Sequence, residues 1–210
     1  MKSRNAAWLK ISGIAGIITP VVAFACILLA IASYPQFSWV ENALSDLGVK
    51  PGLTAPLFNY GLIVSGFLAL VFATGLFKFL RQRILGKIGV FIFILGTLAL
   101  IAIGIFPENI SPTHYYVSVA FFVFLPVSML VLVAAFLLVR KVKMALFTLL
   151  VAIVAVAPWI LYFSIRFVPG VAIPEAISAL SASTWAIVLG YRMVKQASHS
   201  NARSSNYDSS

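Results

Sequence analysis

Long apolar runs, separated by short polar segments, dominate this sequence. Six runs are long enough to cross a bilayer, because about 20 residues at 1.5 Å each span about 30 Å of hydrocarbon. None carries an ionisable side chain away from its ends, as expected when a charge at the bilayer centre costs at least about 2.5 kcal/mol. We therefore predict an all-α integral membrane protein with six transmembrane helices, over Ile11–Ser33, Leu57–Leu80, Ile88–Phe106, Tyr115–Val139, Met144–Ile165 and Pro174–Val194.

The composition supports this class. Of the 210 residues, 62% are hydrophobic and 10% are charged, and the mean hydropathy is +1.07. Soluble domains contain about 45–50% apolar and about 25% charged residues. A chain this apolar could not cover its surface with polar groups in water, so we predict residues 1–195 to form one transmembrane domain in the plasma membrane.

The basic residues indicate the topology. The net charge is +10, but the Lys and Arg side chains lie at the ends of the apolar runs rather than on one face, which argues against nucleic-acid binding. With the N-terminus inside, 13 of the 15 basic residues are cytoplasmic, and only Lys50 and Arg166 lie outside. The positive-inside rule then predicts that both termini are cytoplasmic. Cleavage of helix one after Ala30-Ile-Ala32, as in a signal peptide, is the alternative, and it would leave the remaining topology unchanged.

The first outer loop, residues 34 to 56, has a pattern of its own. Ser38 and Glu41 form a capping-box pair, and Gly48 offers a left-handed stop. Between them apolar and polar residues separate onto two faces, so we predict a short amphipathic interfacial helix across about Trp39 to Leu47. At the other end of the chain, residues 196–210 are rich in Ser and Asn, which predicts a disordered cytoplasmic tail.

The polar chemistry collects on the predicted outer face. Four of the five acidic residues map there, together with the only histidine outside the tail, His114. His114 falls in the first turn of helix four, where the helix dipole favours a neutral imidazole that can act as base, acceptor or metal ligand. Glu175 also opens a helix, and the dipole alone explains it. We predict one outer cup, in which Asp46 lies beside His114, with six candidate binding residues: Asn42, Ser45, Asp46, Asn59, Glu108 and His114.

A family resemblance rests on the same residues. Asn42-Ala-Leu-Ser-Asp-Leu-Gly48, Pro56-Leu-Phe-Asn59, Phe106-Pro-Glu108 and His114 resemble the pattern of a prokaryotic membrane family catalogued as domain of unknown function 998. The resemblance spans roughly residues 10 to 195. It implies a compact helical membrane protein, and the family carries no assigned reaction to transfer.

The sequence leaves the activity open. It contains no Walker loop, no Gly-x-Ser-x-Gly elbow, no His-Glu-x-x-His and no cysteine pair, so no cofactor or metal is assigned. The favoured hypothesis is a cup that binds a lipid headgroup, a cation or a membrane-protein partner. An outer-face lipid hydrolase is the alternative, with Ser45, Asp46 and His114 as catalytic candidates. A passive lipid or small-molecule transporter is the second alternative, because the spans lack the buried charges that ion coupling uses.

Overall fold

Helices are the natural structure for these apolar segments, because backbone N–H and C=O groups in lipid must bond within their own segment. The computed structural model describes residues 2–80 and 84–208. In these ranges the regular elements are six α-helices and one short 3₁₀ helix, η1, with no strand: α1 (Lys2–Ala32), η1 (Ser45–Val49), α2 (Thr54–Phe79), α3 (Ile84–Ile105), α4 (Thr113–Leu138), α5 (Val142–Ile165) and α6 (Ala172–Asp208).

All six helices are long and apolar enough to cross a membrane, so the predicted six-helix, multi-pass architecture is confirmed. The candidate span of α6 is Ala172–Ser200, and that of α1 is Asn5–Ala32. Helix α6 continues beyond its candidate span to Asp208, through residues that the sequence predicts to form a disordered tail. Disorder of that tail stays a prediction, and so does the orientation of the bundle.

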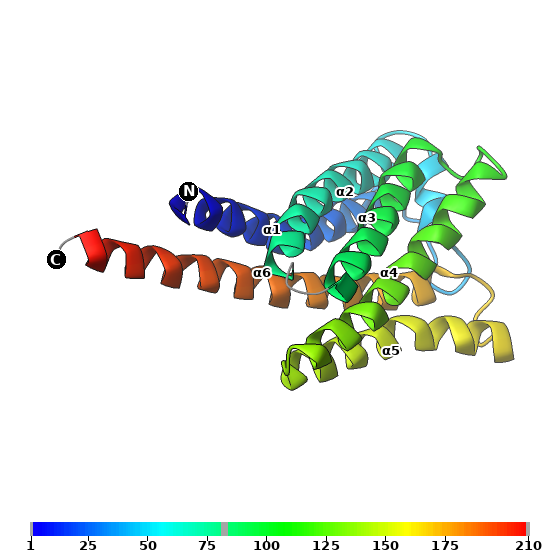
Figure 1. Ribbon diagram of the computed structural model, residues 1–210. Coiled ribbons are helices and arrows are strands. Elements are labelled where there is room, and N and C mark those ends of the chain that lie inside the picture. Colours follow the sequence, from blue (N-terminus) through cyan, green and yellow to red (C-terminus); the bar gives the residue numbers. More distant parts are fainter. Residues whose placement is uncertain (1, 81–83, 209–210) are drawn as a thin grey trace.

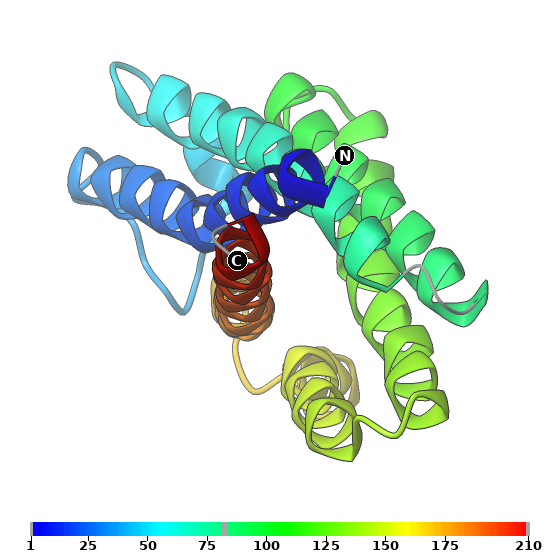
Figure 2. The ribbon, with the colours of Figure 1, turned by 60° about the vertical axis from the view of Figure 1, so that its left-hand side comes forward.

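The helices are arranged as a ring (Figures 1 and 2). Helix α1 packs extensively against both α2 and α6, and α3 packs against α2 and α4. Helix α5 completes the ring between α4 and α6 with less extensive contacts. Both termini lie at one end of the bundle, as an even number of spans requires.

The two ends of the bundle differ in charge. One end, formed by the α1–α2, α3–α4 and α5–α6 connections, holds Glu41, Asp46, Glu108 and Glu175, and we call it the acidic end. The opposite end carries the termini and the two remaining connections. The sequence predicts that residues 78–87, around the α2–α3 connection, are cytoplasmic. This segment includes residues 81–83, which lie outside the described part of the chain.

Aromatic side chains fill the middle of the ring. Phe72 of α2, Phe93 of α3 and Trp185 of α6 meet with ring centroids 5.6 to 6.2 Å apart. The indole N–H of Trp185 donates to Thr148 Oγ1 of α5 at 3.2 Å, so the buried donor is satisfied. This cluster joins α2, α3 and α6, and the bond from Trp185 links it to α5.

The predicted continuous helix over Trp39–Leu47 is wrong. The capping contact at its start does form, since Glu41 N–H donates to Ser38 Oγ at 3.2 Å. The helix stops after one turn because Asp46 Oδ2 accepts from Asn42 Nδ2 and from Ala43 N–H, which bends the chain before η1 begins at Ser45. Short polar side chains of this kind offer the backbone alternatives to a helix. Gly48 lies inside η1 and does not end a helix.

Candidate functional site

The first loop folds onto the acidic end of the bundle. Leu44 and Leu47 are buried in one cluster with Ile27 and Phe58, whereas Trp39 and Val40 of the same loop are exposed. Asn42 and Asp46 bond to one another within the loop: Asn42 Oδ1 accepts from Ser38 N–H at 2.9 Å, and its Nδ2 donates to Asp46 at 2.6 Å. These two residues shape the loop.

Three hydrogen bonds fasten this loop to the α5–α6 connection. Gly170 N–H donates to Val40 O at 2.8 Å, and Ala172 N–H donates to Asn42 O at 2.9 Å. The third bond joins Leu44 N–H to Glu175 Oε2 at 2.6 Å. Gly170 is required at this crossing, because an added Cβ would lie 2.6 Å from Glu41 O and closer still to Asn42 O.

Asn59 fastens the other side of the loop. Its Nδ2 donates to Gly48 O at 2.9 Å, and its buried Oδ1 has no partner among the described residues. The bond between Asn59 and Gly48 positions η1 against α2.

Glu108 brings two loops together. Its carboxyl lies beside Asp46 of the first loop and within the electrostatic reach of Lys50. Partial burial and the neighbouring Asp46 carboxylate raise the pKa of Glu108 to about 7, while Lys50 acts in the opposite direction. Glu108 therefore changes its charge near neutral pH.

His114 lies in the first turn of α4, as predicted, and is buried. Its Nδ1 lies 2.7 Å from Phe106 O and its Nε2 lies 3.3 Å from Ser118 Oγ. Since a carbonyl oxygen only accepts, Nδ1 carries a proton, and in the neutral ring Nε2 accepts from the Ser118 hydroxyl. Among the described residues Asp46 and His114 form no hydrogen bond with one another, and their predicted proximity stays a prediction.

A groove of about 860 Å³ lies between α4 and α5 and opens at the acidic end. The two helices meet at their short connection and diverge toward this end (Figure 1). Polar residues line the mouth, and apolar side chains continue along α4 to Val127, about 20 Å beyond His114 at 1.5 Å per residue. The lining residues are Ala43, Ser45, Glu108, Ser111, His114, Tyr115, Ser118, Val119, Phe122, Val123, Pro126, Val127, Val156, Trp159, Tyr162, Phe163, Val171 and Glu175.

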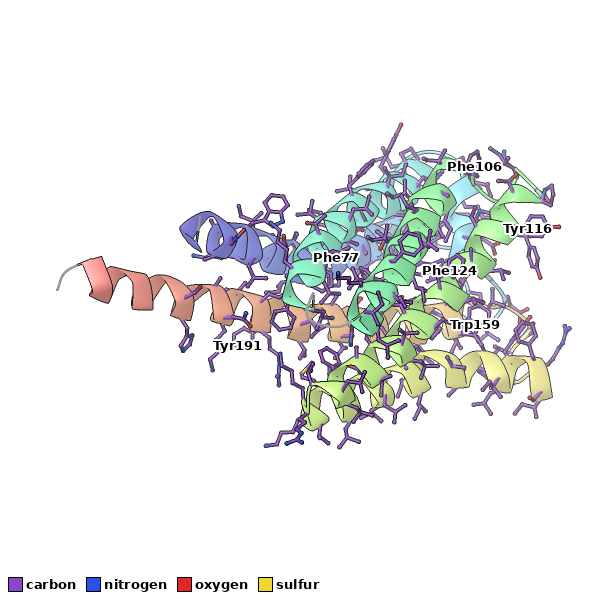
Figure 3. The ribbon with its side chains drawn as sticks, viewed as in Figure 1. Phe77, Phe106, Tyr116, Phe124, Trp159 and Tyr191 are labelled. Carbon is purple, nitrogen blue, oxygen red and sulfur yellow. The ribbon has the colours of Figure 1, made fainter. Side chains whose placement is uncertain are left out.

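Aromatic rings form one wall of the groove. Trp159 lies on the side of α5 that faces α4 (Figure 3), and its ring centroid is 4.8 Å from that of Phe122. The Trp159 indole N–H donates to Ser178 Oγ of α6 at 2.9 Å, and that hydroxyl donates to Ala155 O. These contacts fix the orientation of the ring.

A smaller cavity of about 130 Å³ lies inside the ring, next to the groove. Its lining is almost wholly apolar, and it shares Ser45, Ser118, Phe122 and Glu175 with the groove. The fully buried Ser65 hydroxyl, also in this lining, has no hydrogen-bond partner among the described residues. Glu175 thus lines both an amphipathic groove and a smaller apolar cavity.

The predicted site is divided between two roles. Ser45, Glu108 and His114 line the groove together, whereas Asn42 and Asn59 make their observed contacts with the loop. Asp46 bonds within the loop and also lies beside Glu108. Sequence reasoning missed Glu175, which is 8% exposed. The available signal was that Glu175 is the only carboxylate within the six candidate spans. It also missed Ser118 and Trp159, which no local motif marks.

Across the described residues, no three His, Cys, Asp or Glu side chains are grouped as metal ligands would be. In comparisons with known proteins, the model of the family described as "Protein of unknown function (DUF998)" matches residues 17–192. No curated protein and no solved structure matches the chain. The family match agrees with the resemblance found in the sequence.

Proposed function

Because the chain belongs to the family described as Protein of unknown function (DUF998) and carries six candidate membrane spans, we propose that it acts within the bilayer, by binding a membrane lipid in the α4–α5 groove. The observation that supports lipid binding is the shape and polarity of that groove. Its mouth offers Glu108, His114 and Ser111 to a headgroup, and Phe122, Val123 and Val156 offer an apolar surface to a chain. Sites for such ligands are mostly apolar clefts with a few converging polar groups.

The orientation forms part of the proposal. The acidic end faces outside, and the opposite end, which carries the termini, faces the cytoplasm, because this arrangement satisfies the positive-inside rule. The lipid then enters the groove laterally from the outer leaflet, between the diverging ends of α4 and α5. Binding is favoured over passive transport, since the lining runs from the acidic end only to Val127, about midway along α4.

Native mass spectrometry tests lipid binding directly. Val156→Trp adds a large ring to the groove wall, and Val154→Trp adds the same ring two residues away, at an exposed position outside the groove lining. We expect the unmodified protein and Val154→Trp to retain a co-purified lipid, and Val156→Trp to lose it. Equal retention by all three proteins would contradict binding in this groove.

The contact between Ser118 and His114 favours a second candidate, a lipid hydrolase. The 3.3 Å separation would let His114 Nε2 take the proton of the Ser118 hydroxyl, while Phe106 O orients the ring. In this reading Ser118 replaces Ser45, because Ser45 makes no hydrogen bond with His114 among the described residues. Release of fatty acid from an acyl ester by the purified protein, abolished in Ser118→Ala, would establish it. Intact recovery of the ester favours binding alone.

A further inference from the structure

The ionisable side chains along the groove are mostly acidic. Its ionisable lining consists of Glu108, Glu175, His114 and two tyrosines, and the described lining contains no Lys or Arg although the chain carries a net charge of +10. Two cations at this end lie over aromatic rings: Lys50 over Tyr34 at 5.1 Å, and Arg166 at 5.9 Å over Tyr162, which itself lines the groove. The groove therefore favours a positively charged ligand.

The surroundings of Glu175 also favour a positively charged ligand. One carboxylate oxygen accepts from Leu44 N–H at 2.6 Å, and among the described residues the other receives no hydrogen bond and no cation lies within ion-pair distance. A carboxylate that is 8% exposed at the edge of a membrane span is costly unless it is paired. Its free oxygen belongs to a side chain that lines both the groove and the inner cavity.

The aromatic wall complements these carboxylates. Trp159, Tyr162 and Phe163 line the groove from α5, and Phe122 and Tyr115 line it from α4. Faces of aromatic rings attract ammonium groups, with a preference for Trp, and the attraction strengthens when the site is desolvated. Carboxylates at the mouth and aromatic faces beside them form the combination that recognises an organic ammonium ion.

Resting on the proposed lipid binding, we propose that the ligand is an amphiphile whose headgroup is an ammonium ion without a phosphate, held between Glu175, Glu108 and the aromatic wall. The described lining contains no Lys or Arg that would pair with a phosphate or carboxylate, and the nearby Arg166 lies over the Tyr162 ring. The alkyl chain lies along Val123, Val127 and Val156. The shared lining at Glu175 brings the charged headgroup next to the inner cavity.

A series of headgroups on one chain length tests this proposal. The full-length protein in uncharged maltoside micelles is dialysed against radiolabelled dodecyltrimethylammonium, dodecylphosphocholine, laurate and a neutral dodecyl glycerol ether. Specific binding is the amount lost in Val156→Trp, which removes the contribution of the micelle. We expect specific binding of the ammonium probe to exceed that of the other three by about tenfold, or about 1.4 kcal/mol.

Two charge-neutralising variants locate the preference. Glu175→Gln is expected to bring the ammonium and neutral probes to similar affinity. Glu41→Gln removes one charge from an exposed position at the same end, outside the groove lining, and is expected to keep the tenfold preference. If Glu175→Gln does not fold, Glu108→Gln is used, with a smaller loss of preference expected.

The outcomes separate the two proposals. Laurate or dodecylphosphocholine binding as tightly as the ammonium probe would overturn the ammonium proposal and leave lipid binding intact. An unchanged preference in both Glu175→Gln and Glu108→Gln would also overturn it. If no probe binds the unmodified protein better than Val156→Trp, lipid binding in the groove is itself wrong.

Discussion

Gly170→Ala tests the crossing that holds the first loop over the groove. An alanine Cβ would lie 2.6 Å from Glu41 O, and ordinary contacts begin near 3.4 Å, so the two backbones must separate by about 1 Å. The bonds from Gly170 N–H and Ala172 N–H, now 2.8 and 2.9 Å long, would then exceed hydrogen-bond range. Each bond contributes about 0.5–1.5 kcal/mol net, so we expect a loss of about 1–3 kcal/mol.

Chemical unfolding in mixed micelles measures this loss. The matched control is Gly96→Ala in α3, where an added Cβ would lie 3.4 Å from Phe124 Cβ, an ordinary contact. We expect Gly96→Ala to be neutral or slightly stabilising, since alanine favours a helix over glycine. Lipid retention should fall in Gly170→Ala, because the first loop that Gly170 holds also carries Leu44, whose N–H bonds to Glu175 of the groove lining. Equal stability of both variants and the unmodified protein would refute the reasoning.

Three further predictions address Glu175, Glu108 and the orientation. Glu175→Leu should be less stable than Glu175→Gln by about 1–3 kcal/mol, because only glutamine keeps an acceptor for the buried Leu44 N–H; equal unfolding free energies would contradict this. The raised pKa of Glu108, about 7 against an ordinary 4.5, means that the folded state holds this proton more tightly than the unfolded state. The free energy of unfolding should therefore fall as pH rises from about 4.5 to 7. Measured against pH, it should give a flatter profile for Glu108→Gln, and an unchanged profile would count against the assignment. In a Cys26→Ala background, an impermeant thiol reagent should label Asn109→Cys in intact cells and Lys143→Cys only after permeabilisation, and the reverse pattern would invert the proposed orientation.

The membrane fold could be predicted from the sequence because its signal is long and redundant. Each span repeats the same apolar requirement over some 20 residues, so single irregularities such as Pro20 or Pro126 do not disturb the prediction. The first loop gave a shorter and more ambiguous signal. Ser38 does cap a turn, but Asn42 and Asp46 bond to one another and end it, and pairs of short polar side chains can support either outcome.

The groove could not be predicted, because it depends on an angle between helices. Trp159 and Phe122 are 37 positions apart, and neither belongs to a local motif. Their meeting requires α4 and α5 to diverge from a short connection, and no sequence pattern in those helices specifies that divergence. His114 and Glu108 were found because ionisable residues are scarce in this chain and their connection to the acidic end follows from topology alone.

Glu175 shows why a sufficient local explanation can hide a site. A helix N-terminus stabilises a carboxylate by about 0.3–1 kcal/mol when it is exposed, and that accounts for an acidic first turn facing water. At 8% exposure the comparison changes, because removing a carboxylate from water costs several kcal/mol. The bond from Leu44 N–H returns about 1.5–3 kcal/mol, as bonds to charged groups do. Under the ammonium proposal, a cation in the adjoining groove would offset part of this cost. The residue that the sequence explained most easily is therefore the one on which the proposed ligand site depends.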